Sequence, residues 1–170
     1  MSDPEALFNA HRHRLFKYFC RAIGHAEAAR DLTQDVFVRV TRGAIPAAPD
    51  GQVAAWLFRI ARNLALDYHR DRRRRPEPVL LADGGSREAS QDTSVAVNEA
   101  LASLDDLDRD VFLMREVAGL GYDAIASACG LTPDAVRSRI HRTRLQLREK
   151  LSASIEKQRA ASMRRSDTSR

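Results

Sequence analysis

The possible folds of this chain are constrained most by residues 119–150, which have the pattern of two short helices joined by a tight turn. Apolar side chains recur at i, i+3, i+4 and i+7 along the first helix, at Tyr122, Ile125, Ala126 and Cys129. Gly130 suits the end of that helix, because glycine adopts the left-handed conformation without a steric penalty. Thr132 is a good N-cap for the second helix. Pro133 fits its first turn, where a missing N–H leaves no helical hydrogen bond unmade.

The second helix of this pair, expected over residues 133–151, is unusually rich in arginine. Its inward stripe is predicted to contain Val136, Ile140, Thr143, Leu147 and Leu151. Its arginines lie off that stripe, at Arg137, Arg139, Arg142, Arg144 and Arg148. Two short helices, a tight turn and a basic second helix are the parts of a DNA-binding helix-turn-helix. The alternative is a helical hairpin with a solvated basic face.

Periodicity predicts an all-α chain with two helical blocks. In the N-terminal block, residues 1–75, we expect helices over about 4–23, 26–41 and 52–74, with a proline-containing loop at 43–51. The first two helices are expected to bury Leu7, Leu15, Tyr18, Phe19, Ala22, Ile23, Ala29, Leu32, Val36, Phe37 and Val40. The third is expected to bury Val53, Trp56, Leu57, Ile60, Ala61, Leu64 and Tyr68.

Two prolines, adjacent glycines and an acidic bias predict a linker at residues 76–95. The C-terminal block, residues 96–151, is expected to hold four short helices over about 96–103, 106–117, 122–129 and 133–151. Acidic residues are concentrated at Asp105–Asp110 in this block, and basic residues at Arg137–Arg148. The basic tail, residues 152–170, shows little periodicity, and we expect it to be disordered.

The outward face of the third helix offers a second basic surface. It carries Arg59, Arg62, Asn63 and Arg70 and runs into an arginine cluster that includes Arg73 and Arg74. Such a face can neutralise phosphates, and Asn63 can pair with a base edge. Tyr68 and His69 can stack on the bases of a single strand. The alternative is a solvated basic face on a core helix.

The second helix presents a different, acidic surface. Asp31, Gln34, Asp35 and Arg39 project from it, with Phe37 toward the edge of its apolar stripe. Acidic and partly apolar character suits a protein partner with a basic surface rather than DNA. Ordinary surface acids are the alternative.

Composition and motifs favour a binding protein over an enzyme. The net charge of +5 favours a polyanionic partner, and no phosphate-binding glycine motif is present. The five histidines are scattered, and Cys20 and Cys129 alone cannot build a four-ligand zinc site. We therefore expect no catalytic residues, cofactor, metal or small-molecule substrate. No apolar run is long enough to span a bilayer, so we expect a cytoplasmic protein without membrane insertion.

Three segments, residues 29–42, 55–75 and 119–150, resemble motifs of the extracytoplasmic-function (ECF) group of bacterial RNA polymerase sigma factors. They stand in the same order and at the same spacing as in that family. The resemblance implies that residues 1–75 correspond to sigma region 2 and residues 96–151 to region 4. It implies core polymerase binding by Asp31, Gln34, Asp35, Phe37 and Arg39. It implies contact with the non-template strand of the −10 element by Arg59, Arg62, Asn63, Arg70, Arg73 and Arg74, with the loop 44–52 around an extruded base.

In the −35 element, the resemblance implies base contacts by Ser138, His141 and Arg142. It implies phosphate contacts by Arg137, Arg139, Arg144 and Arg148. The implied partners are bacterial core RNA polymerase, promoter DNA and an anti-sigma factor, for which exposed Phe37 and Leu120 are the expected contacts. Two other functions remain open at this point: a stand-alone helix-turn-helix regulator, and a sigma-like decoy that binds an anti-sigma factor without touching DNA.

Overall fold

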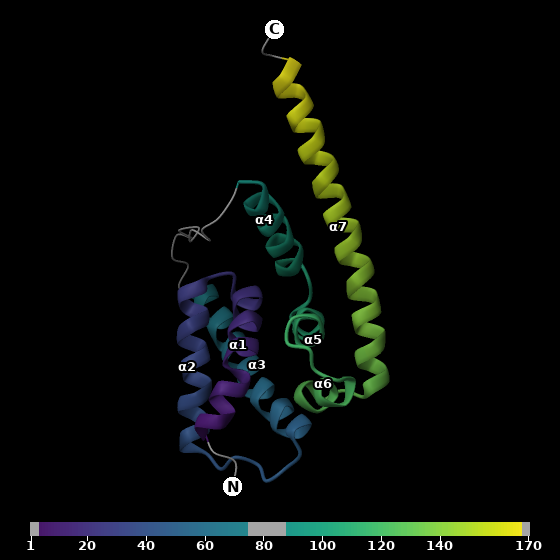
Figure 1. Cartoon of the computed structure of the whole chain (residues 1–170). Coiled ribbons are helices and arrows are strands. Elements are labelled where there is room, and N and C mark those ends of the chain that lie inside the picture. The colour runs from purple at the N-terminus through teal and green to yellow at the C-terminus, as the bar shows by residue number, and fades with distance from the viewer. Residues whose placement is uncertain (1–3, 75–87, 168–170) are drawn as a thin grey trace.

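A computed structural model of the protein describes residues 4–74 and 88–167, and every regular element in these ranges is an α-helix. The N-terminal block contains α1 (Pro4–Ile23), α2 (Ala26–Arg42) and α3 (Asp50–Arg74). The C-terminal block contains α4 (Glu88–Ala102), α5 (Asp106–Glu116), α6 (Tyr122–Cys129) and α7 (Pro133–Asp167). Figure 1 shows the two blocks side by side, and the all-α prediction with two helical blocks is confirmed. Within the described ranges, none of the helices is both long and apolar enough to cross a bilayer.

In the N-terminal block, α1 and α2 form a hairpin against which α3 packs. Gly24 lies between them with a φ of 74°, in the conformation that glycine adopts most readily. Every residue predicted to face inward from α1 and α2 is buried. Leu15, Phe19 and Val36 have no exposed surface, and burying a side chain of this size stabilises the fold by about 1.5–3 kcal/mol.

In the C-terminal block, α6, the turn after it and the start of α7 form the predicted helix-turn-helix. Gly130 has a φ of 68° and ends α6, as predicted. The Thr132 side chain accepts a hydrogen bond from the Ala135 backbone N–H at 3.2 Å, which confirms the predicted N-cap. Val136, Ile140, Thr143 and Leu147 of α7 are buried, and Leu151 is half-buried.

The two blocks pack directly against each other, and this changes the surroundings of α3. α6 lies against α3, while α4 and α5 contact α1. The predicted stripe of α3 is joined by a second stripe at Ala54, Phe58 and Ala65, all buried. Trp56, Ile60 and Tyr68, predicted to be inward, are only half-buried. A helix packed on more than one side buries more of its surface than a single amphipathic stripe predicts.

Two predicted irregular segments are shorter than expected. α4 begins at Glu88, inside the predicted linker 76–95, whose residues 76–87 lie outside the described ranges. The tail prediction was wrong over residues 152–167, because α7 continues without interruption to Asp167 and projects past the other helices (Figure 1). This stretch lacks glycine and proline and is rich in strong helix formers. Extending a helix that is already nucleated also costs far less than starting one.

Candidate nucleic-acid interface

The basic face of α7 is open to solvent. Six of the seven predicted −35 residues are exposed: Arg137, Ser138, His141, Arg142, Arg144 and Arg148. The seventh, Arg139, is half-buried. The buried stripe of α7 holds the helix on α5 and α6, so its opposite face is presented as a convex basic surface. A helix in this setting has the shape and charge to enter the major groove of DNA.

Acidic side chains already hold three of these arginines. Arg137 pairs with Asp134 on the same helix at 2.6 Å, and both side chains are largely exposed. Arg139 pairs with Asp108 of α5, and Arg144 pairs with Glu116 at the end of α5. The pairs of Arg137 and Arg144 are exposed. Exposed pairs contribute about 0–1 kcal/mol, so a phosphate can replace the carboxylate there at little cost. The Arg139–Asp108 pair is more enclosed, with side chains 27% and 18% exposed.

The basic residues of α3 lie on two different faces. Arg59, Asn63, Arg70 and Arg74 are exposed and follow each other at i, i+4, i+11 and i+15, which places them on one stripe. We name this set the outer stripe. Arg62 and Arg73, at i and i+11, lie on a neighbouring stripe that faces the C-terminal block. Of the six predicted −10 residues, Arg62 is half-buried against α5, and Arg73 is 73% exposed and pairs with α5 at 3.5 Å. The four residues of the outer stripe have no ion pair with α5 among the described residues.

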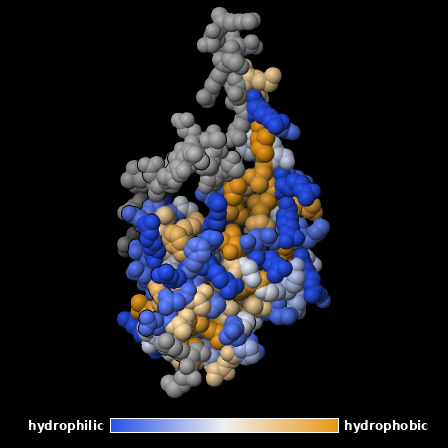
Figure 2. All heavy atoms as spheres, in the orientation of Figure 1, coloured by the Kyte–Doolittle hydropathy of each residue, from blue (hydrophilic) through white to orange (hydrophobic). Residues whose placement is uncertain are grey.

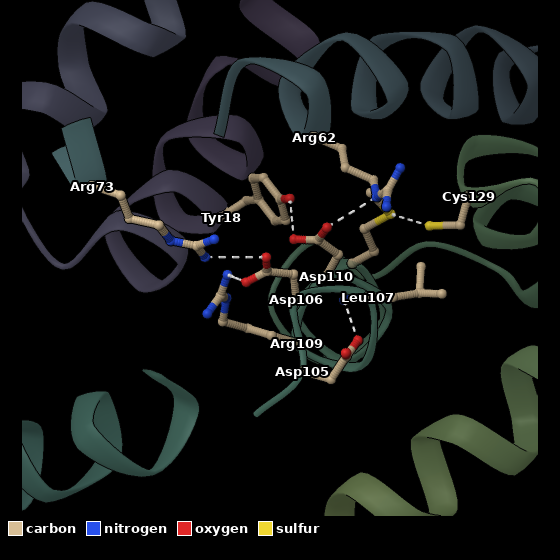
Figure 3. Close-up of polar contacts among 10 residues, drawn as sticks. Tyr18, Arg62, Arg73, Asp105, Asp106, Leu107, Arg109, Asp110 and Cys129 are labelled. Carbon is tan, nitrogen blue, oxygen red and sulfur yellow. Dashed lines mark hydrogen bonds and ion pairs between the residues drawn. The ribbon is translucent and has the colours of Figure 1, made fainter. Parts of the chain in front are cut away.

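The two held arginines meet an acidic cluster on α5 (Figure 3). The Asp110 carboxylate accepts hydrogen bonds from Arg62 Nε at 2.9 Å and from the Tyr18 hydroxyl at 3.0 Å. Asp106 accepts hydrogen bonds from Arg109 at 2.6 Å and from Arg73 at 3.5 Å. The acidic run of α5 was visible in the sequence, but its pairing with α3 was missed, because Arg62 is 48 residues away from Asp110.

Asp110 is the most enclosed charge of this cluster, with 2% of its surface exposed. Burial raises the pKa of its carboxyl group to about 6, although Arg62, Tyr18 and Arg109 act in the opposite direction. Burial, together with the charge of Asp110, also raises the pKa of Tyr18 well above its usual value. Tyr18 therefore stays a neutral hydrogen-bond donor to Asp110 throughout the physiological pH range.

The proposed stacking role of His69 does not fit the structure. Its Nε2 lies 3.0 Å from the Ala22 carbonyl oxygen, so the ring is tied to the end of α1. Tyr68 is half-buried, and the Arg72 guanidinium lies over its ring at 5.9 Å from the centroid. Neither ring is presented as an open platform for a base. Among the described residues, no group of three or more His, Cys, Asp or Glu side chains is placed to bind a metal ion.

The outward face of α2 carries four of the five residues predicted to bind polymerase. Asp31, Gln34, Asp35 and Arg39 are exposed. Phe37 is the exception: it is 8% exposed and packs edge-on against the Phe8 ring, with centroids 4.5 Å apart. Its assignment to the binding surface was therefore wrong. Val38, 42% exposed, is the apolar residue that this face presents instead.

Leu120 is also unavailable as a surface contact. It is 2% exposed and lies in the turn between α5 and α6. There it lines a cavity of about 660 Å³ together with residues of α1 and α3, such as Leu7 and Val53. The expected anti-sigma contacts Phe37 and Leu120 both belong to the interior, because side chains of neighbouring helices enclose them.

Comparison with protein-family models identifies both blocks. Residues 7–75 match the family described as Sigma-70 region 2, and residues 94–147 match Sigma-70, region 4. The first match covers α1, α2 and α3, with the outer stripe and the acidic face of α2. The second covers the helix-turn-helix and the basic face of α7 as far as Arg144.

Individual relatives agree with this result. The chain is 33% identical to the ECF RNA polymerase sigma factor SigE of Mycolicibacterium smegmatis over 162 residues, 89% of this chain and 62% of that protein. It is 32% identical to the ECF RNA polymerase sigma factor SigC of Mycobacterium tuberculosis over 133 residues, 74% of this chain and 71% of that protein. The fold resembles CnrH, solved in complex with the cytosolic domain of CnrY, with a TM-score of 0.69, 28% identity and 88% of each chain covered. The chain belongs to the ECF group of bacterial RNA polymerase sigma factors and is a transcription initiation factor.

Proposed function

We propose that the chain binds core RNA polymerase through the outward face of α2 and directs it to promoters with two separate DNA-binding helices. α7 reads the −35 element, and the outer stripe of α3 holds the non-template strand of the −10 element. The observation that carries this proposal is the presence of two exposed arginine faces on two blocks that match sigma regions 2 and 4. Bacterial transcription takes place in the cytoplasm, so the proposal places the chain there.

On α7, we assign base contacts to Ser138, His141 and Arg142. They follow each other at i, i+3 and i+4, so one face of the helix presents all three toward the groove floor. Arg142 has no ion-pair partner among the described residues, and its guanidinium can form the bidentate contact with guanine. Arg137, Arg139, Arg144 and Arg148 flank this face, and we assign them to phosphates.

On α3, the outer stripe provides both kinds of contact that a single strand requires. Arg59, Arg70 and Arg74 neutralise phosphates, while Asn63 offers a donor and an acceptor to a base edge. The loop between α2 and α3 joins the stripe at its N-terminal end and is mostly exposed over residues 43–49, so it is placed to border an extruded base. Arg62 and Arg73 join this surface only when they are released from α5.

On α2, the polymerase-binding surface consists of Asp31, Gln34, Asp35 and Arg39 around the exposed Val38. Its acidic residues complement a basic partner surface, and Val38 supplies apolar area that favours a stable contact. The surface lies on the side of α2 opposite its buried stripe, so polymerase binding leaves the core of the N-terminal block undisturbed.

We also propose an anti-sigma factor as a partner, in keeping with the CnrH structure, which contains the cytosolic domain of CnrY. Figure 2 shows hydrophobic side chains gathered between α4 and α7, where a groove of about 420 Å³ opens. Its apolar walls include Leu101, Phe112 and Leu151, and its rim carries Arg144 and Arg148. An amphipathic helix with acidic edges fits such a groove, and it would cover two arginines assigned to −35 phosphates.

The test of the main proposal is transcription in vitro with purified core polymerase, the full chain and a pool of genomic promoter fragments. Discrete start sites that require the chain support the proposal. The Asn63→Ala variant, which alters an exposed side chain, is expected to reduce open-complex formation while it retains polymerase binding. Stable binding to duplex DNA without polymerase, combined with no transcripts, would instead favour a stand-alone regulator.

A further inference from the structure

α5 occupies a special position, because its acidic side chains reach both DNA-binding helices. Toward α3, Asp110 pairs with Arg62 and Asp106 pairs with Arg73. Toward α7, Asp108 pairs with Arg139 and Glu116, at the end of α5, pairs with Arg144. All four of these arginines were predicted from the sequence to contact promoter DNA. A carboxylate offers guanidinium groups the same kind of charged oxygen acceptor that a phosphate does.

The contact between α5 and α3 is a closed seam between the blocks. The Arg62 side chain is 22% exposed and the Asp110 side chain 3%. Tyr18 of α1 donates to the same carboxylate and has no exposed surface. Near the other end of α5, Arg14 Nε donates to the Ala118 carbonyl oxygen at 2.6 Å. Contacts from α1 and α3 thus fix α5 in place, and while the seam is closed Asp110 occupies the Nε of Arg62 and most of the Arg62 side chain is covered.

We propose that α5 is a built-in competitor for promoter DNA, which holds Arg62 and Arg73 in the free chain and releases them when the two blocks separate. The inference rests on the proposed −10 role of α3. It divides that surface into two parts. The outer stripe lies outside the seam, whereas Arg62 inside the seam and Arg73 at its exposed edge are free of their carboxylate partners only in the open state. The free chain consequently binds single-stranded DNA more weakly than its arginine content predicts.

If α5 competes with DNA for Arg62 and Arg73, a charge reversal on α5 should shift the chain from the closed to the open state. Asp110→Arg places a cation beside Arg62 and Arg109 at a position with almost no free volume, so the closed seam becomes unfavourable. In the open state residue 110 faces water, where an arginine is tolerated. Asp106→Arg is a milder variant, because Asp106 lies at the partly exposed edge of the same seam, with 38% of its side chain accessible.

Asp71→Arg is the matched control. It makes the same change of charge on α3, at an exposed position with no ion-pair partner among the described residues, so it releases no arginine. Binding of a fluorescein-labelled oligothymidylate to the full-length chain is measured by anisotropy over a range of salt concentrations. Each phosphate newly neutralised on a single strand steepens the plot of log K against log salt by about 0.7. We expect Asp110→Arg to steepen it by about 1.4, Asp71→Arg by about 0.7, and Asp106→Arg to fall between wild type and Asp110→Arg.

The opening itself is measured without DNA, by energy transfer between dyes on Thr41→Cys in α2 and Ser127→Cys in α6. Both positions are exposed, and Cys20 and Cys129 are replaced by alanine in this background. Lower transfer in Asp110→Arg and Asp106→Arg than in Asp71→Arg supports the proposal. Equal transfer in all variants that remain helical by circular dichroism would overturn it. If transfer falls but Arg59→Ala does not weaken oligothymidylate binding, the seam opens as proposed and the −10 role of α3 is the part that fails.

Discussion

Closure of the seam is expected to depend on pH through Asp110. In the closed chain the pKa of this carboxyl group is about 6, because burial disfavours the charged form, whereas its usual value is 3.8. The closed state therefore binds a proton more tightly than an open state in which Asp110 is solvated. By linkage, closing becomes more favourable as the pH falls through about 6, and the gain stops below the open-state pKa.

The size of the effect follows from these two values. Going from about pH 7.5 to about pH 5, the closed state takes up most of one proton and the open state very little. The resulting change in closing free energy is about 1.4 kcal/mol, which makes the closed-to-open ratio about tenfold larger at the lower pH. Among the other groups that face Asp110, Tyr18 and Cys129 have raised pKa values and stay neutral in this range, and the cations are Arg62 and Arg109.

The assay is the same energy transfer between α2 and α6, recorded across this pH range, with Cys129 replaced as above. Asp110→Asn is the decisive comparison, because its side chain is close to isosteric with the acid and does not titrate. We expect it to remain closed at all pH values and to lose the tenfold change. The burial of His69, whose pKa is lowered, affects both proteins equally and cancels in the comparison. A wild-type seam that opens on acidification, or an Asp110→Asn variant with unchanged pH dependence, would refute the reasoning.

Three further predictions concern other parts of the chain. Arg142→Ala is expected to reduce discrimination between −35 sequences by about 1–3 kcal/mol, as measured by competition binding. Arg148→Ala is expected to weaken all duplex binding and to lower the slope of log K against log salt by about 0.9, as measured by salt titration. The same pattern from both variants would contradict the division of roles. Asp35→Arg should abolish assembly with core polymerase in a pull-down but leave −35 duplex binding by the full chain unchanged, and loss of both would indicate misfolding instead. Gly130→Ala should lower the free energy of unfolding by about 1–2 kcal/mol, because the φ of residue 130 is 68°. Gly51→Ala should raise the free energy of unfolding by about 0.5–1 kcal/mol, because residue 51 is helical, has no positive φ and has open space around it. Thermal denaturation of the two variants tests the sign of each change.

The helices were predictable because each one buries a stripe that repeats every three or four residues. Leu15, Phe19 and Val36 could be placed in the core from that repeat alone. Phe58 could not, because it lies off the main stripe of α3 and is buried by helices that pack on a second side. The small residues Ala54 and Ala65 on the same side were the available signal, since they allow close approach of a neighbouring helix.

In the candidate site, too, helical periodicity predicts which way a side chain faces but not which helix packs against it. The outward orientation of Arg59 and Asn63 follows from the helical repeat of α3 itself. The capture of Arg62 by Asp110 depends on how two blocks dock, and no local pattern encodes that docking. Phe37 was misassigned for a related reason: it lies at the edge of the α2 stripe, and the ring of Phe8 from α1 covers it. Local periodicity determines which face a residue is on, while the partner of that face is determined by tertiary packing.

α7 is one continuous helix, so its C-terminal half is mechanically coupled to the helix-turn-helix at its N-terminal end. With a rise of about 1.5 Å per residue, residues 152–167 extend the helix by about 24 Å beyond the part that packs in the block. Because no glycine or proline interrupts this stretch, a sideways force at its far end becomes a torque on the turn before α7, the helix that we propose reads the −35 element. A bulky protein fused near residue 167 would thus tilt the helix-turn-helix, whereas the same protein fused through a flexible tail would leave its orientation unchanged.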